Sequence, residues 1–155
     1  MTVAAKLVEL LKAQGLTCAT AESCTGGGVG SAITAVPGSS EVFAGGVISY
    51  SNEVKRDVLG VSAADLQSVG AVSGEVAAQM ADGVRRLLKT DLAVSLTGIA
   101  GPGGGSDEKP VGLGWFGIAT KDGVRTEKCV FRGDRASVRE QAVVHALGML
   151  TVAAL

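Results

Sequence analysis

The strongest constraint on the fold of this chain is an alternation of short strand-like segments with longer segments of helical periodicity. Apolar segments of strand composition occupy residues 16–21, 42–50 and 92–97. Helical patterns begin near Val3 and close at Gly15, occupy residues 26–35, 52–59 and 73–88, and run from Asp134 almost to Leu155. This alternation is typical of an α/β sandwich built on a largely parallel sheet.

The C-terminal part of the chain adds a hairpin to this pattern. Residues 111–120 and 124–131 have strand composition and flank Asp122-Gly123, which is a strong turn signal. At least one strand is therefore antiparallel, and we expect a mixed, mostly parallel sheet of about five strands. The chain has 155 residues and neither a repeat nor a linker, so we expect one domain spanning residues 1–155.

Charge and composition exclude several classes of partner. The net charge of −1 and the lack of a basic run argue against a nucleic-acid partner. No apolar run approaches the roughly 20 residues that a membrane-spanning helix needs, and the first residues lack the features of a signal peptide. Cys18, Cys24 and Cys129 have no metal-type spacing, which indicates reduced thiols and no metal site. We expect a cytoplasmic domain without a membrane contact.

The side chains best suited to catalysis lie together at Glu22-Ser23-Cys24, shortly before three glycines at 26–28. A strand-like segment gives way there to a helix, whose free N–H groups favour developing negative charge. Glycines allow the backbone to approach a ligand closely, as an oxyanion hole requires. Ser23 is therefore a candidate nucleophile, with an ordinary helix N-cap as its alternative. Cys24 is a rival nucleophile, although a small buried thiol explains it more simply.

The base that would activate Ser23 is not obvious, because the chain has a single histidine. His145 lies among apolar residues of the last helix, where a packing role is expected. Lys55 follows a strand end, and burial could lower its pKa enough for it to act as a base. A solvated surface lysine is the alternative. The phenol of Tyr50 could relay a proton or position Ser23, with core packing as the alternative.

Arg135 and Arg139 stand four residues apart at the start of the last helix and so share one face. Cations are mildly unfavourable at a helix N-terminus, which points to a compensating anion. That anion is either a bound phosphate or the neighbouring carboxylates of Asp134 and Glu140. Both explanations remain open at this point.

Six ordered motifs together resemble the CinA C-terminal-domain family, which includes nicotinamide mononucleotide amidohydrolases. They lie at residues 21–27, 50–55, 70–73, 97–102, 108–112 and 133–135. The resemblance covers essentially the whole chain and indicates a stand-alone form of the domain. It implies a three-layer α/β/α fold with a mixed sheet, a homodimer, and no metal or organic cofactor.

The resemblance also implies a reaction, in which nicotinamide mononucleotide and water give nicotinic acid mononucleotide and ammonia, a step of pyridine nucleotide salvage. On matching positions, Ser23 is the nucleophile, Lys55 the general base and Tyr50 their partner. Thr97 and the loop from Gly98 are expected near the reacting carbonyl.

Hypothetical substrate contacts complete this expectation. Glu22 would offset the charge of the pyridinium ring, Asn52 would bind the carboxamide, and Arg135 or Arg139 would hold the phosphate. The other expected contacts are Thr25, Gly26 and Gly27. Two alternatives remain: a non-catalytic nucleotide-binding regulatory module linked to competence or DNA damage, and an amidase for another small amide.

Overall fold

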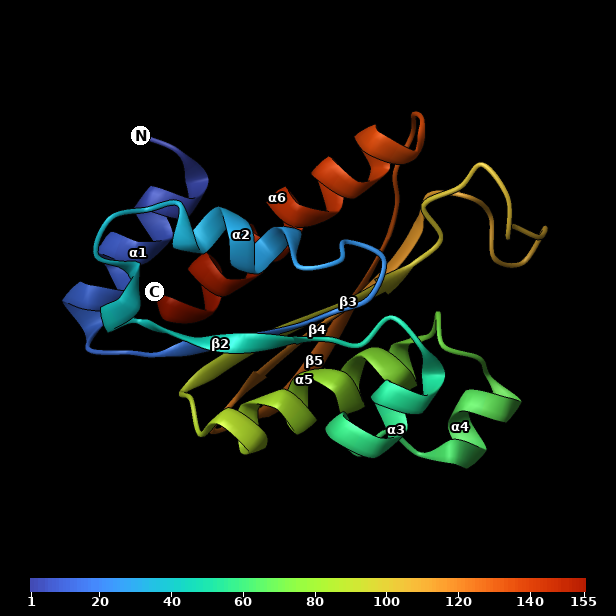
Figure 1. Ribbon diagram of the computed structural model, residues 1–155, viewed down its shortest axis with the longest axis horizontal. Helices are drawn as coiled ribbons and strands as arrows, with labels where there is room; N and C mark the ends of the chain where they lie inside the picture. The colour runs from blue at the N-terminus through green and yellow to red at the C-terminus, as the bar shows by residue number, and fades with distance from the viewer.

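The computed structural model describes all residues from Met1 to Leu155. Five strands form one sheet between two layers of helices (Figure 1). The strands are β1 (Cys18–Glu22), β2 (Phe43–Ile48), β3 (Leu92–Gly98), β4 (Leu113–Thr120) and β5 (Gly123–Val130). The helices are α1 (Val3–Gln14), α2 (Gly28–Thr34), α3 (Asn52–Leu59), α4 (Ala63–Ser68), α5 (Gly74–Leu88) and α6 (Arg135–Ala154), with a 3₁₀ turn η1 (Ser39–Glu41).

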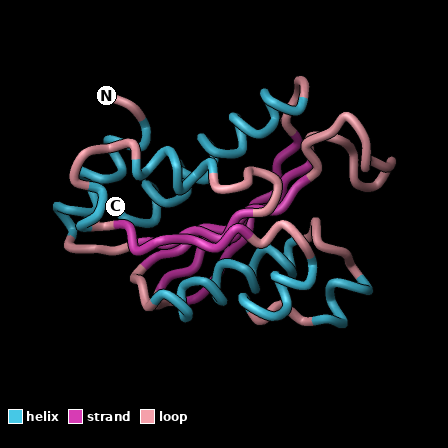
Figure 2. Tube along the Cα trace, viewed as in Figure 1, coloured by secondary structure: helices cyan, strands magenta, loops and turns pink.

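The sheet has the strand order β2-β1-β3-β4-β5. Strand β1 pairs in parallel with β2 and with β3, whereas β4 runs antiparallel to both β3 and β5. Four of the five strands therefore point the same way, and only β4 is reversed. The predicted mixed α/β sandwich of five strands is confirmed, and Figure 2 shows the strands crossing the middle of the molecule between helices.

Each face of the sheet has its own hydrophobic core. Helices α1, α2 and α6 cover one face, and α3, α4 and α5 lie on the other (Figure 1). Helix α5 buries Val76, Met80 and Val84 against the sheet, whereas Leu87 near its end is 49% exposed. The helix ends one residue later at Leu88, and Leu87 extends past the edge of the buried stripe.

The helix ends follow their capping residues closely. Gly15 and Gly60 adopt the left-handed conformation after α1 and α3, and the side chains of Ser73 and Asp134 accept N–H groups at the starts of α5 and α6. Helix α4 was missed by the sequence reasoning. It has six residues and buries none of them, so it leaves no apolar periodicity to detect.

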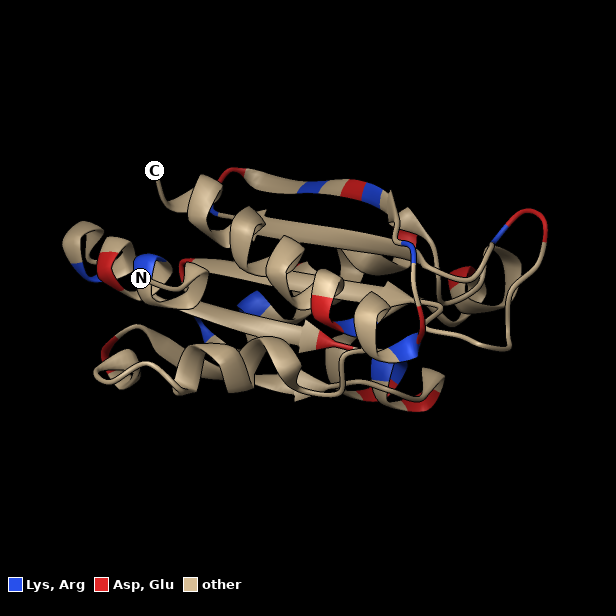
Figure 3. Ribbon diagram, turned by 90° about the horizontal axis from the view of Figure 1, so that it is seen from above, with Lys and Arg blue, Asp and Glu red and all other residues tan.

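The charged residues are distributed over the surface without forming a face of one sign. Figure 3 shows acidic and basic segments interspersed along the helices and along β5. None of the helices combines the length and the apolar character needed to cross a bilayer.

Two helical glycines provide a test of the packing between layers. Gly83 lies inside α5, and a Cβ atom there would overlap the backbone carbonyl of Leu59 at the end of α3. Gly83→Ala is therefore expected to lower the free energy of unfolding by about 2 kcal/mol, despite the better helix propensity of alanine. The matched control is Gly148→Ala in α6, where nothing lies within 4 Å. It is expected to raise the free energy by about 1 kcal/mol. Urea unfolding of both variants measures the difference, and equal shifts would contradict the close approach.

Candidate active site

A pocket of about 270 Å³ opens at the carboxyl ends of β1 and β3. Parallel strands place their carboxyl ends at the same edge of a sheet, where ligands of α/β proteins bind. The loop after β1 and the loop after β3 both reach this pocket. Its lining consists of Ser23, Cys24, Tyr50, Asn52, Lys55, Ala71, Val72, Thr97, Gly98, Ala100 and Arg135.

Ser23 stands at the first position after β1. Its N–H donates to the Leu96 carbonyl at 3.1 Å, which continues the pairing between β1 and β3 past the end of the strand. The side chain is nearly buried, and its Oγ lies 3.0 Å from Nζ of Lys55. The sheet therefore holds the backbone of the candidate nucleophile rigidly while its hydroxyl faces the pocket.

Lys55 reaches this hydroxyl from α3, in the opposite helix layer from α2. Ser51 caps the helix through Val54 N–H, and Lys55 lies on its inward face with only 1% of its surface exposed. Its Nζ has three neighbours within hydrogen-bond distance: Oγ of Ser23, the Ser49 carbonyl at 2.6 Å and the Tyr50 carbonyl at 3.1 Å. None of these neighbours is a carboxylate.

This environment favours the neutral amine. Burial lowers the pKa of Lys55, and only a weaker interaction with Cys24 opposes that shift. An uncharged amine has two N–H donors and one lone pair, which match two carbonyls and one hydroxyl. When charged, Nζ donates to all three oxygens; when neutral, it would donate to the Ser49 and Tyr50 carbonyls and accept the hydroxyl hydrogen of Ser23. The arrangement can remove a proton from the serine.

Tyr50 contributes its backbone carbonyl to the site, and the role expected for its phenol stays a prediction. The side chain lines the mouth of the pocket but is 64% exposed. The carbonyl of Tyr50, with that of Ser49, positions the lysine. Sequence reasoning missed Ser49 because a main-chain acceptor leaves no residue-type signal.

Glu22 and Thr25 stabilise the loop that connects β1 to α2. The Glu22 carboxylate is 2% exposed and accepts hydrogen bonds from the Thr25 hydroxyl at 2.6 Å, Val29 N–H at 2.8 Å and Gly30 N–H at 3.0 Å. It thus binds the start of α2 and does not line the pocket of Ser23. The expected pairing of Glu22 with a substrate ring has no geometric support, because its oxygens are used by the helix.

The loop between Ser23 and α2 turns through two glycines. Gly26 and Gly27 have φ values of +59° and +101°, which favour glycine because it has no Cβ. The Gly26 N–H donates to the Ser23 carbonyl, closing the turn. The N–H groups of Cys24 and Thr25 donate to no other residue, and that of Cys24 lies close to its own thiol. Donors that bind no other residue therefore follow the candidate nucleophile directly.

Three other predicted contacts line the pocket from β3 and α3. Thr97 is buried on β3 and donates through Oγ1 to the Ala71 carbonyl at 3.0 Å. Gly98 follows it, and a Cβ atom there would lie 2.8 Å from the Leu113 carbonyl and 3.3 Å from Sγ of Cys24. Asn52, the first residue of α3, lies at the exposed mouth of the pocket. Gly98 thus leaves no room for a side chain beside Cys24.

The two arginines of α6 donate hydrogen bonds to backbone carbonyls of two loops. Arg135 lines the pocket and donates from Nη1 to the Gly101 carbonyl at 2.8 Å. Arg139 donates from Nε to the Cys24 carbonyl at 3.0 Å and from Nη2 to the Thr25 carbonyl at 3.2 Å. Neither arginine forms an ion pair with Asp134 or Glu140. Backbone carbonyls, rather than side-chain carboxylates, therefore accept from both guanidinium groups.

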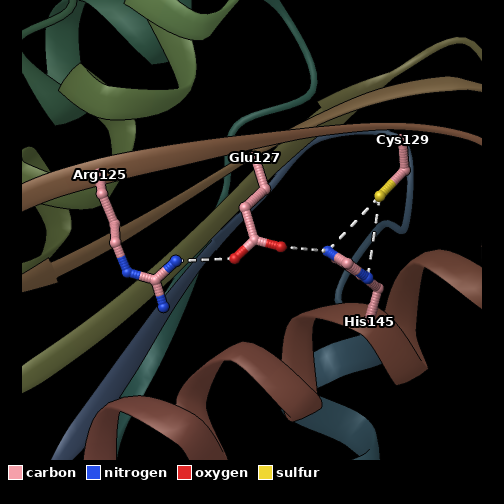
Figure 4. Close-up of polar contacts among 4 residues, drawn as sticks. All are labelled: Arg125, Glu127, Cys129 and His145. Carbon is pink, nitrogen blue, oxygen red and sulfur yellow. Dashed lines mark hydrogen bonds and ion pairs between the residues drawn. The ribbon is translucent and has the colours of Figure 1, made fainter.

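The single histidine lies apart from this pocket. His145 is held between α6 and β5, with Nε2 at 3.2 Å from Oε1 of Glu127 and 3.5 Å from Sγ of Cys129 (Figure 4). Its ring also packs on Phe116, at 4.5 Å between centroids. Cys24 lines the pocket, but burial raises the pKa of its thiol and so disfavours the nucleophilic thiolate. Ser23 and Lys55 have no histidine beside them.

The family model described as CinA C-terminal domain matches residues 1–153. A competence-damage inducible protein of Halothermothrix orenii is 58% identical over 128 residues, which are 82% of this chain and 31% of that protein. A CinA-like protein of Rippkaea orientalis is 51% identical over 152 residues, which are 96% of this chain and 36% of that protein. The chain thus spans about a third of the length of these curated relatives.

Solved structures agree with the match in sequence. The competence/damage inducible protein CihA of Agrobacterium tumefaciens has a TM-score of 0.94 and 42% identity, covering 98% of this chain and 93% of that one. A CinA superfamily protein of Klebsiella pneumoniae has a TM-score of 0.94 and 35% identity, covering 98% and 95% of the two chains. The fold and the sequence therefore lead to one conclusion: this chain belongs to the CinA C-terminal domain family.

Proposed function

We propose that this chain is a nicotinamide-nucleotide amidase, which hydrolyses the carboxamide of nicotinamide mononucleotide to nicotinic acid mononucleotide and ammonia. The observation that carries the proposal is the 3.0 Å contact between Ser23 Oγ and a buried Lys55 Nζ without a carboxylate partner. A serine beside a neutral amine is an activated nucleophile suited to acyl transfer. The family resemblance supports this choice of amide.

The proposed reaction has two steps that share one proton carrier. Ser23 Oγ attacks the carboxamide carbon while Lys55 accepts the hydroxyl proton. The C–N bond then breaks, and Lys55 passes that proton to the departing nitrogen, which leaves as ammonia. Water attacks the resulting ester and gives a proton to Lys55, which returns it to Ser23 as the acid is released. Protein groups supply every proton transfer in this scheme.

Two properties of the mononucleotide fit this pocket. Its ring nitrogen is positively charged, so the ring withdraws electrons and makes the carboxamide carbon easier to attack than that of free nicotinamide. Its phosphate needs a cation, and Arg135 lines the pocket with one N–H on the Gly101 carbonyl and its other donors available. Asn52 at the mouth has the amide chemistry to bind the carboxamide. The free thiols of Cys18, Cys24 and Cys129 fit a reducing cytoplasm, where we place the reaction.

Ammonia release from a panel of amides tests this proposal. The purified protein is incubated with nicotinamide mononucleotide, with the riboside that lacks the phosphate, and with free nicotinamide. We expect ammonia from the mononucleotide, slower release from the riboside and none from nicotinamide. Release from a different small amide alone would make the chain another amidase. Binding of the mononucleotide without ammonia release would favour a regulatory module and overturn the proposal.

A further inference from the structure

We propose that Arg139 is a positioning residue for catalysis, which orients a main-chain N–H donor for the oxyanion formed at Ser23. This inference rests on the amidase function proposed above and deepens it. Arg139 does not line the pocket, so it acts on the reaction through the loop that it holds.

The contacts of Arg139 determine the direction of one peptide unit. Its Nε donates to the Cys24 carbonyl, and its Nη2 donates to the Thr25 carbonyl. In a trans peptide, the carbonyl and the N–H of the same unit point in opposite directions. The carbonyl of Cys24 and the N–H of Thr25 belong to one unit. A Cys24 carbonyl turned towards Arg139 therefore turns the Thr25 N–H away from it.

The layers of the fold give the direction that we infer for that N–H. Arg139 belongs to α6, on the face of the sheet covered by α1 and α2, whereas Lys55 comes from α3 on the opposite face (Figure 1). A donor directed away from α6 points towards the layer that supplies Lys55. The Thr25 N–H has no hydrogen-bond acceptor in the protein. Thr25 itself is 2% exposed, and the pocket wall at this position is formed by the preceding residue, Cys24. The oxyanion would therefore meet this donor beside Cys24.

The neighbouring peptide unit is oriented without the arginine. The Ser23 carbonyl accepts the Gly26 N–H at 3.1 Å, which orients the N–H of Cys24 in the same unit. Two successive donors that bind no other residue therefore follow the nucleophile, one oriented by the turn and the other by Arg139. Preorganised donors stabilise an oxyanion because they need no rearrangement when charge develops. The guanidinium suits this task, since its planar fork can bind two carbonyls at once.

The first test is the steady-state kinetics of Arg139 variants. Arg139→Ala is expected to lower kcat for the mononucleotide about 100-fold with little change in KM, which is the scale for loss of one oxyanion donor. Arg139→Lys, which offers a point charge without a fork, should fall between Ala and the wild type. Added methylguanidinium should restore part of kcat in the alanine variant, whereas methylammonium should not. Arg132→Met, an exposed arginine outside the pocket, serves as the control with unchanged kinetics.

The results also separate this inference from a structural or phosphate-binding role. An alanine variant that loses stability but keeps the wild-type kcat at temperatures where it is folded would overturn the inference. A rise in KM with unchanged kcat would assign Arg139 to the phosphate instead.

Labelling by a fluorophosphonate provides a readout that does not depend on the natural substrate. Ser23 Oγ forms a bond to phosphorus, fluoride leaves and Lys55 takes the serine proton. If the wild type is labelled but releases no ammonia from the mononucleotide, the proposed substrate fails and the Arg139 inference is still testable. Slower labelling of Arg139→Ala would then support it, and equal labelling would overturn it. A wild type that is not labelled would refute both proposals, because each requires a reactive Ser23.

Discussion

Ser23→Ala is expected to abolish ammonia release from nicotinamide mononucleotide, lowering kcat by about 10⁴-fold or more. The substitution removes the only atom that forms a bond to the carboxamide carbon, and no step of the scheme proceeds without it. The oxygen is held 3.0 Å from the Lys55 amine by a backbone that continues the pairing between β1 and β3. A water molecule in its place would lack that orientation.

Cys24→Ala is the matched control for this prediction, since it removes a nucleophilic atom from the adjacent position in the same pocket. It is expected to retain most of the activity because its buried thiol takes no part in the scheme. Circular dichroism and urea unfolding of both variants check that the fold is intact. Loss of activity in Cys24→Ala together with full activity in Ser23→Ala would transfer the nucleophilic role to the thiol.

Lys55→Met is expected to have an effect of similar size on kcat, because methionine keeps the length of the apolar stem and removes the amine. Lys55→Arg is the more discriminating variant. A guanidinium keeps the positive charge and its donors but does not lose a proton in the accessible pH range. If Lys55 acts as a base, both variants are inactive. Substantial activity in Lys55→Arg would instead mean that the lysine acts only through its charge.

The pH dependence of the wild type follows from the same residue. Burial lowers the pKa of Lys55 below the ordinary lysine value of 10.5, and only the neutral amine can accept the serine proton. The value of kcat/KM is therefore expected to rise with pH and to level off at a pH below 10.5. A profile without a rise would remove Lys55 as the base.

The free energy of unfolding should change with pH over the same range. Between the lowered pKa of the folded state and 10.5, the unfolded chain holds a proton at this lysine that the folded chain has lost. Stability contributed by this group therefore rises with pH over that interval and is lost again as pH falls through the folded-state pKa. The free energy of unfolding of the wild type relative to Lys55→Met should show this rise. A difference that does not change with pH would contradict a buried lysine of lowered pKa.

The order of the elements was predictable because each depends on residues close together in the chain. Gly15 and Gly60 end helices where the sequence placed them, and Ser73 and Asp134 start helices as caps. Such positions reflect local backbone preferences, which a sequence states directly. Helix α4 was missed for the same reason, since it offers no buried face to detect.

The roles of individual polar residues were harder to predict, because they depend on partners distant in the chain. Glu22 was expected at a substrate ring and instead binds the start of α2 through Thr25, Val29 and Gly30. Tyr50 was expected to act through its phenol, and the structure adds its backbone carbonyl, which accepts from Lys55. The residue type alone does not show whether a carboxylate or a phenol will contact a ligand or the backbone.

The sequence by itself determined the alternation of helices and strands, the glycine turn after β1 and the residue types available for catalysis: a serine, a lysine and a single histidine. Only the tertiary structure decided which of these meet. Lys55 and Ser23 are 32 residues apart and Arg139 and Cys24 are 115 apart, and the sheet and the two helix layers bring each pair within 3.0 Å. The physical reason is that residue type sets what a side chain can do, whereas burial and the direction of backbone carbonyls, which arise only on folding, set its protonation and its partner.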